Sequence, residues 1–446
     1  MKIMKKYSFY SLCVLVLLFQ SSCLFQEDDL FDEPAAQRLN HALSETEALL
    51  VDASNGWIME YFPTNSLEGY TFLMKFTPDG KVVVASKNKY TRNYTEEVGC
   101  WEMIGDNGPV LTFNTFINIF HLFSDPRNPG EVGYNGLGVG GDYEFMVLKN
   151  EENRISLKGK KRGTDIVLKR MDKDQNWEGY FTKLEEMDAL LFNPKLVLTW
   201  TLSSETPRLI EPLYKLNSGY SKIFVATPLG VREDLENDEA ELDFKVPFIV
   251  TDYGFRLAQP MKVGEDYVQM FKLSENKDYM YAEEESDVKI TGVTDLANFF
   301  VSNREVVWIF DEASLSSDMK LIYERIVNST KGTYANVSDV SLAIAYTPAL
   351  PISSFSLRLI IARNNGAPTL YGNLDLSPTI EDGAFSFSST RRGDSNGDAF
   401  YNRIDGYKEM LELLSTSFSI STTSPLNPAD IAFTGTAGNI SFQTFR

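Results

Sequence analysis

The chain has 446 residues, of which 43% are hydrophobic and 13% aromatic, and its formal net charge at neutral pH is −20. Binding to nucleic acid or to anionic lipid through charge neutralisation needs clustered lysine and arginine. The one locally basic run of the sequence, 158–162, is better explained as the solvated edge of a hairpin. The composition therefore argues against nucleic acid as a partner, and at this length two domains are the default expectation.

The first 22 residues have the organisation of a secretory signal peptide. Three lysines precede an apolar run, 12–19, and the small residue Ser22 precedes Cys23. The run is well short of the roughly 20 apolar residues that span a bilayer, and its order is that of a cleaved signal. We expect residues 1–22 to be removed and Cys23 to be acylated, although Gln20 stands where such signals usually have leucine. An ordinary signal peptide that is cut elsewhere is the alternative.

The mature chain is expected to begin with an acidic tether, 23–33, which carries carboxylates and no basic residue. Removal of residues 1–22 takes away three lysines, so the formal charge moves from −20 to −23. Cys13 leaves with the signal and Cys23 is acylated, so Cys100 remains alone and no disulfide can form within the mature chain. Because Cys100 precedes Trp101 in an apolar strand, it is expected in the core.

The next segment, 34–172, changes from a helical to a strand pattern. Asp32 and Pro34 are typical of a helix start, and leucines then recur at helical spacing until 55–56. Alternating apolar runs separated by turn residues follow, such as 77–80 between two strands. The predicted strands are 57–62, 70–76, 81–86, 98–103, 110–116, 143–148, 154–160 and 164–170. Eight consecutive antiparallel strands predict an up-and-down barrel or a sandwich, and a barrel of this size can hold one small ligand.

The long connection between the fifth and sixth of these strands, 121–141, is the first candidate ligand site. Long ordered loops are disproportionately functional, and this one carries His121, Asp125, Arg127 and Tyr134. The alternative for His121 is a structural role at a strand end. The glycines of 136–141 are followed by a strand and not by a helix, so we expect a bulge or a close backbone approach there and not a phosphate loop.

The second predicted domain, 173–446, mixes strands with isolated amphipathic helices. A helical pattern starts at Trp177 and ends before Asn193-Pro194, and later helices are expected at about 315–329 and around 404–414. Predicted strands lie near 195–202, 221–226, 245–257, 267–273, 338–347, 355–363, 369–375 and 383–388. Because strands come in runs and not between regular crossover helices, the whole chain is predicted to be β-rich α+β.

A second candidate site lies near the C-terminus, where Asp394, Asn396 and Asp398 stand at the first, third and fifth positions of a calcium-loop pattern, with Asp405 at the twelfth. Ala399 replaces the glycine that such a loop needs, and Asp405 is shorter than the usual glutamate. A polar turn before the last helix is the alternative. No other cofactor is expected.

Seven segments of the chain together form a recognisable set: 55–61, 70–80, 106–113, 121–126, 140–145, 157–161 and 246–254. In these segments the chain resembles a family of Bacteroidetes lipoproteins that is known only as domain of unknown function 4302. The resemblance implies a surface lipoprotein that accompanies nutrient-uptake systems of the outer membrane, and the acidic tether is similar to an export tag for the outer face. It implies no catalytic residue.

The sequence contains no His-Glu-x-x-His, no Gly-x-Ser-x-Gly and no pair of histidines at metal spacing. We therefore expect a binding or accessory module without catalytic activity, anchored by lipid to the outer membrane on the cell exterior, beside a transporter, with a glycan or peptide as ligand. Alternatives are a glycan- or peptide-directed hydrolase that uses two of the 62 carboxylates, and a structural or assembly subunit of an outer-membrane complex.

Overall fold

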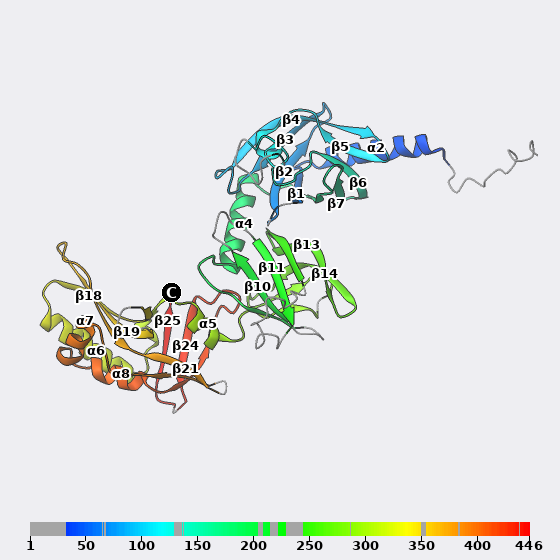
Figure 1. Ribbon diagram of the computed structural model, residues 1–446. Coiled ribbons are helices and arrows are strands. Elements are labelled where there is room, and N and C mark those ends of the chain that lie inside the picture. The colour runs from blue at the N-terminus through cyan, green and yellow to red at the C-terminus, as the bar shows by residue number, and fades with distance from the viewer. Residues whose placement is uncertain are drawn as a thin grey trace, which may run out of the picture.

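The computed structural model contains two closed antiparallel barrels of eight strands each, followed by a nine-stranded antiparallel sheet with helices (Figure 1). The residues it describes are 33–64, 66, 68–128, 136, 138–203, 208–214, 222–228, 244–285, 287–348, 354–381, 384–436 and 438–446. The predicted β-rich α+β class is confirmed, and the choice left open between a barrel and a sandwich is decided in favour of a closed barrel.

The first barrel follows a leading helix, α2 (Ala35–Asp52), which begins directly after Pro34. Each strand pairs with the next one in sequence, and β1 closes the barrel by pairing with β8. The strands are β1 (Trp57–Phe62), β2 (Tyr70–Phe76), β3 (Lys81–Ser86), β4 (Thr95–Gly105), β5 (Pro109–Phe113), β6 (Glu144–Glu151), β7 (Arg154–Gly159) and β8 (Asp165–Arg170). All eight predicted strands are present.

Alternation along the strands fills this barrel with aromatic rings. On β1, Trp57, Met59 and Tyr61 belong to the barrel's apolar core, because every second side chain of a strand points to the same face. The Trp57 indole N–H donates to the carbonyl oxygen of Leu50 at 3.0 Å, which fixes the end of α2 against the barrel. Trp101 lies inside as well, as its alternation predicts.

Helix α4 (Trp177–Leu191) connects the two barrels (Figure 1). Its N-cap is Asn176, whose side-chain oxygen accepts a hydrogen bond from the backbone N–H of Gly179 at 2.7 Å. Tyr180 and Phe181 pack on outward-facing residues of the first barrel in a small separate apolar cluster. The predicted domain boundary near residue 172 falls between β8 and this helix.

The second barrel closes through the pairing of β16 with β9. Its strands are β9 (Trp200–Ser203), β10 (Arg208–Tyr214), β11 (Lys222–Pro228), β12 (Phe244–Thr251), β13 (Gly254–Val263), β14 (Asp266–Leu273), β15 (Met280–Ala282) and β16 (Lys289–Ile290). The single strand predicted over 245–257 is in fact two strands, since Asp252 and Tyr253 form a tight turn between β12 and β13. Phe248, Phe255 and Phe271 pack in its core.

The last part of the chain forms one large curved sheet. Its strand order is β20-β19-β18-β17-β25-β24-β23-β22-β21. The strands are β17 (Val307–Phe310), β18 (Val337–Thr347), β19 (Ser354–Arg363), β20 (Leu370–Asp375), β21 (Ser377–Glu381), β22 (Ala384–Ser388), β23 (Ser417–Ser421), β24 (Asp430–Gly435) and β25 (Ser441–Phe445). The edge strands β20 and β21 are separated in the chain by Leu376 alone, and the hydroxyls of Ser354 of β19 and Ser377 of β21 hydrogen bond at 2.7 Å.

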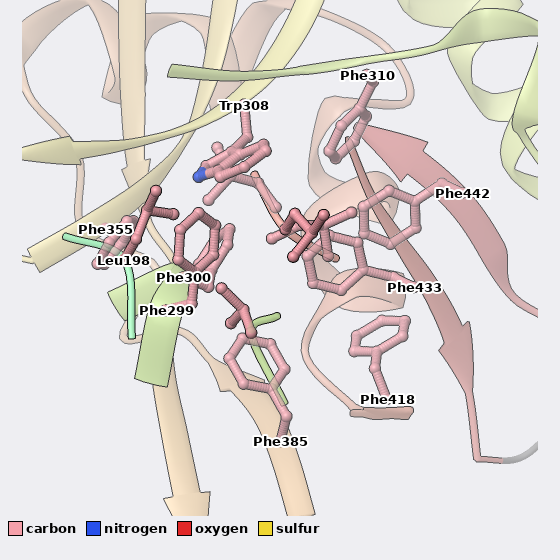
Figure 2. Packing of buried hydrophobic residues seen from close by; sticks show 14 of the residues in the cluster. Leu198, Phe299, Phe300, Trp308, Phe310, Phe355, Phe385, Phe418, Phe433 and Phe442 are labelled. Atoms are coloured by element: carbon pink, nitrogen blue, oxygen red, sulfur yellow. The ribbon is translucent and has the colours of Figure 1, made fainter. Parts of the chain in front are cut away.

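Helices α5 (Leu296–Ser302), α6 (Ser317–Thr333), α7 (Ser395–Arg403) and α8 (Tyr407–Leu414) accompany this sheet, with the short 3-10 helix η3 (Glu312–Ser314). Figure 2 shows Phe300 of α5 among Trp308, Phe355 and Phe385, and Phe433 beside Phe442. The same apolar cluster runs from Leu191 to Phe442, so the second barrel and the large sheet have one continuous core. The first barrel has a core of its own.

Candidate functional site

A cleft of about 650 Å³ lies where the two barrels meet. Arg154 and Lys169 border it from the first barrel, Met187 from α4, and Tyr253 and Tyr281 from the second barrel. This volume is within the range of small-molecule and peptide sites, which are usually concave and located between domains. The cleft is the leading candidate site.

The cleft lies beside a cluster of charges buried between the barrels. Glu60 of β1 and Arg256 of β13 form an ion pair in which both side chains are 2% exposed. Lys169 of β8 donates to the other oxygen of Glu60 at 2.7 Å and also to the hydroxyl of Tyr253. One anion is therefore shared by two cations from different barrels, and this sharing connects the two folds.

Strand alternation places these charges on the outer surfaces of the barrels. Glu60 lies between Met59 and Tyr61, which point into the first barrel, and Arg256 lies between Phe255 and Leu257, which point into the second. Each charged side chain would face water in an isolated barrel. The contact between the barrels removes that water, so each charge needs a partner from the other side.

Burial and neighbouring charges together shift pKa values at the junction of the barrels. Burial raises the pKa of Glu60, but Arg256 and Lys169 outweigh burial, and the pKa ends below its ordinary value. Burial holds the pKa of Asp252 above its ordinary value. Burial also raises the pKa of Tyr253, which is therefore a neutral hydrogen-bonding group at physiological pH.

The walls of the cleft carry charges of both signs. Lys272 pairs with Glu283 at 2.5 Å, and Lys272 also lies 5.6 Å from the ring centre of Tyr253. Four cationic side chains and three carboxylates border the cleft: Arg154, Lys169, Lys272, Lys277, Asp252, Glu275 and Glu283. The chain as a whole has a net charge of −20, whereas positive and negative side chains are nearly equal in number around the cleft. Such a surface suits a ligand that itself carries both positive and negative charge.

A second cleft of about 420 Å³ is bordered by the first barrel, α4 and β12. Lys89 pairs with Glu68, which is 8% exposed, and Lys87 pairs with Glu185 of α4 at 2.6 Å. The first pair lies within the loops of the first barrel, and the second joins that barrel to α4.

His121, the first predicted ligand residue, ends the short helix α3 (Asn118–His121) and is 6% exposed. Its Nδ1 accepts a hydrogen bond from the backbone N–H of Ile117 at 3.0 Å. Its ring lies between those of Phe116 and Tyr143, with centroid distances of 5.1 and 5.4 Å. Burial lowers the pKa of His121 although Glu97 and Asp125 act in the opposite direction, so the ring is neutral at pH 7.

Asp125 and Arg127 lie in the turn that follows. The guanidinium of Arg127 donates to both oxygens of Asp125, at 3.2 and 2.9 Å, and these bonds hold the pKa of Asp125 below its usual range. The backbone N–H of Asp125 donates to the carbonyl oxygen of His121 at 2.9 Å. Tyr134, the fourth predicted residue, lies outside the described residues. None of the described residues of 121–141 borders either cleft.

The glycine-rich segment before β6 makes the close backbone approach that the sequence predicts. A Cβ on Gly141 would lie 2.3 Å from the Tyr61 hydroxyl and 2.8 Å from the carbonyl oxygen of Phe123. Gly138 has a φ of +58° and lies close to the same carbonyl. The glycines therefore fold the long connection onto the end of the barrel.

The residues of the predicted calcium loop have other partners. Asp394 caps α7, where its carboxylate accepts the backbone N–H of Gly397 at 2.6 Å and that of Asn373 at 3.2 Å. The Asn396 amide donates to Tyr371, and the backbone of Asp405 donates to Ser329. Asp398 is already in the first turn of the helix. Among the described residues no group of three or more His, Cys, Asp or Glu side chains is arranged to hold a metal ion, and calcium binding stays a prediction.

Two cysteines follow the predicted signal peptide, Cys23 and Cys100. Cys23 lies outside the described residues. Cys100 is exposed, so the expectation that it is a core residue is wrong. The reason is alternation on β4: Trp101 points into the barrel, and its neighbour must therefore point outward.

Sequence reasoning missed the charge cluster at the junction. Glu60 occupies an outward position of β1, and a glutamate at such a position is normally solvated, so the sequence does not indicate that this one is buried. The partner Arg256 is 196 positions further along the chain, and nothing local marks the pair.

Comparisons with known proteins identify the family of this chain. No curated protein matches the chain. Solved structures of two other proteins align with most of this chain. One is the pol III beta of Caulobacter crescentus, which is 10% identical. The alignment covers 91% of this chain and 95% of the Caulobacter chain, with a TM-score of 0.14. A putative DNA polymerase III beta subunit from Eubacterium rectale, 11% identical, covers 92% and 97% with a TM-score of 0.13. Scores this low carry no argument.

Among the described residues no helix is both long and apolar enough to cross a membrane.

The family model described as "Domain of unknown function (DUF4302)" matches residues 27–275. This match spans more than half of the chain, including the first barrel and the hairpin that brings Arg256 to Glu60. The chain belongs to the DUF4302 family.

Proposed function

We propose that this protein is a lipoprotein of Bacteroidetes type, anchored through Cys23 to the outer membrane on the cell exterior, which binds a nutrient ligand without transforming it. The ligand lies in the cleft between the two barrels. The observation that carries this proposal is the cleft itself, in which the lining residue Lys169 is held in place by its ion pair with the buried Glu60. A preorganised side chain of this kind lowers the entropic cost of binding.

A short peptide fits the lining of this cleft better than a neutral glycan does. A peptide carries an ammonium group and a carboxylate group, and the cleft offers carboxylates and cations for both. Met187 and Met270 supply flexible apolar surface that adapts to different side chains. Delivery of the captured peptide to a neighbouring outer-membrane transporter completes the proposed role.

The binding claim is tested with the purified full-length protein and short peptides from a tryptic digest of casein. Mass spectrometry identifies the retained peptides, and calorimetry then measures their affinity. Arg154→Ala and Tyr281→Ala, two changes at the cleft wall, are each expected to weaken binding about tenfold. Lys320→Ala is the matched control, because Lys320 is an exposed cation on α6, away from the cleft.

Two outcomes contradict this proposal. Cleavage of peptides or glycans by the purified protein means a hydrolase with paired carboxylates. Retention of no peptide, together with stable assembly onto an outer-membrane complex, means a structural subunit.

The anchor is tested separately by labelling growing cells with a radioactive fatty acid. Wild-type protein and Cys100→Ala are expected to carry the label, and Cys23→Ala is expected to lose it. Label that persists in Cys23→Ala contradicts the anchor and leaves the cleft untouched.

A further inference from the structure

Two rings contact the His121 ring on the first barrel, and none of the three residues borders the cleft. Phe116 follows β5, His121 ends α3 and Tyr143 precedes β6. The planes of neighbouring rings are inclined by only 33° and 34°. We call these three residues the ring stack.

The two outer rings of the stack are exposed to solvent. Phe116 is 53% exposed and Tyr143 is 43% exposed, whereas His121 between them is 6% exposed. Phe113, Phe120 and Phe123 of the same segments are all in the barrel core. The fold therefore buries most aromatic residues of this region and leaves the rings of Phe116 and Tyr143, which both contact His121, at the surface. A contiguous exposed apolar patch marks a contact site more often than a single exposed side chain does.

Polar groups border the ring stack. The backbone N–H and the side-chain amide of Asn118 both donate to one oxygen of Glu97, at 2.6 and 3.3 Å. The hydroxyl of Thr115 accepts the backbone N–H of Cys100 at 2.8 Å. These contacts fix a carboxylate, an amide and a hydroxyl beside the rings, and each retains further capacity for hydrogen bonds.

The charged side chains that act on His121 are carboxylates. Glu97 and Asp125 both act electrostatically on His121, and the cation nearest in sequence, Arg127, is engaged by Asp125. The His121 ring is neutral at pH 7 because burial lowers its pKa. An acidic glycan or a nucleic acid would therefore meet carboxylates on the His121 side of the ring stack.

We propose that the ring stack, with Glu97 and Asn118, is a second binding site, and that its ligand is a neutral glycan built of hexoses. The apolar face of a hexose ring stacks on an aromatic ring, and its hydroxyls donate to the carboxylate and accept from the amide. Each of the two exposed rings offers an aromatic face to a sugar. This site is separate from the inter-barrel cleft and does not depend on the function proposed for it.

Titration calorimetry with maltohexaose, cellohexaose and mannohexaose tests the second site, with oligogalacturonate as the anionic comparison. At least one neutral hexasaccharide is expected to bind and oligogalacturonate is not. Phe116→Ala and Tyr143→Ala are each expected to weaken binding about fivefold to tenfold, and Tyr143→Phe is expected to retain most of it. Both rings are exposed, so these variants are expected to fold, and thermal melting verifies this.

Tyr267→Ala is the matched control, because Tyr267 is an exposed tyrosine, 60% exposed, on the second barrel. Arg154→Ala separates the two sites, since it is expected to weaken peptide binding and to leave glycan binding unchanged. The inference is overturned if no neutral hexasaccharide binds at millimolar concentration, or if the ring-stack variants bind it as the wild type does. It is also overturned if sedimentation shows a dimer that Phe116→Ala dissociates, because the rings are then a contact between two copies of the chain.

Discussion

The first barrel presents two contrasting outer surfaces. Around β1 and β8 it buries charge, with Glu60 at 2% exposure. Around β5 and β6, which β7 separates from β8, it exposes rings, with Phe116 at 53%. Both surfaces reverse the usual distribution of polar and apolar residues. The difference teaches that buried charge marks where a second fold is attached, whereas exposed rings mark a surface that is left free for a ligand.

Removal of the charge on the buried side is expected to have the largest effect. Glu60→Leu leaves Arg256 and Lys169 in a water-poor junction without their anion, which is expected to lower the free energy of unfolding by about 3–5 kcal/mol. Urea unfolding measures this loss. The double change of Glu60→Leu with Arg256→Met is expected to recover most of it, because the fully buried cation is gone and the remaining Lys169 is 19% exposed. A single variant as stable as the wild type would mean that the ion pair does not hold the junction.

The exposed side is compared through two neighbouring phenylalanines. Phe120 is 1% exposed and lies in the barrel core, so Phe120→Ala is expected to cost about 3–5 kcal/mol through lost burial and the cavity that remains. Phe116→Ala is expected to cost below about 1 kcal/mol, because the ring already faces water. Chemical denaturation of both variants checks the contrast. Equal losses would show that Phe116 is a structural residue, against its assignment to the ring stack.

A smaller effect is expected from pH. Burial lowers the pKa of His121 below its ordinary value of 6.5, so on acidification the unfolded chain takes up this proton before the folded chain does. The contribution of His121 to stability is therefore complete above about pH 6.5 and declines as the pH falls from there through the folded pKa. Unfolding curves at neutral and mildly acidic pH are expected to show a steeper decline for wild type than for His121→Gln. Parallel declines would contradict a buried neutral ring.

The local parts of this fold could be predicted from the sequence. All eight strands of the first barrel were found because each is an alternating run between turn residues, such as the Pro78-Asp79-Gly80 turn before β3. Closure of the second barrel was missed, since β15 and β16 contain three and two residues, and strands that short have no detectable period. The hairpin of Asp252 and Tyr253 was hidden within one apolar run.

The candidate sites were predictable only in part. The sequence singled out His121, Asp125 and Arg127, and they do lie together. It gave no sign that Phe116 and Tyr143 enclose the histidine, because the three come from separate elements. The cleft depends on contacts between the barrels, and a charge pair 196 positions apart has no local pattern. Strands and loops can therefore be predicted from a single sequence, whereas a surface formed by two barrels in contact cannot.

The central claim is that a peptide occupies the cleft between the barrels. Hydrogen exchange of the full-length protein, with and without its tightest casein peptide, tests this most directly. Bound peptide is expected to slow exchange in β14, in β15 and in the turn before β7, and to leave α6 unchanged. Protection confined to other parts of the chain, or none at saturating peptide, would contradict the account.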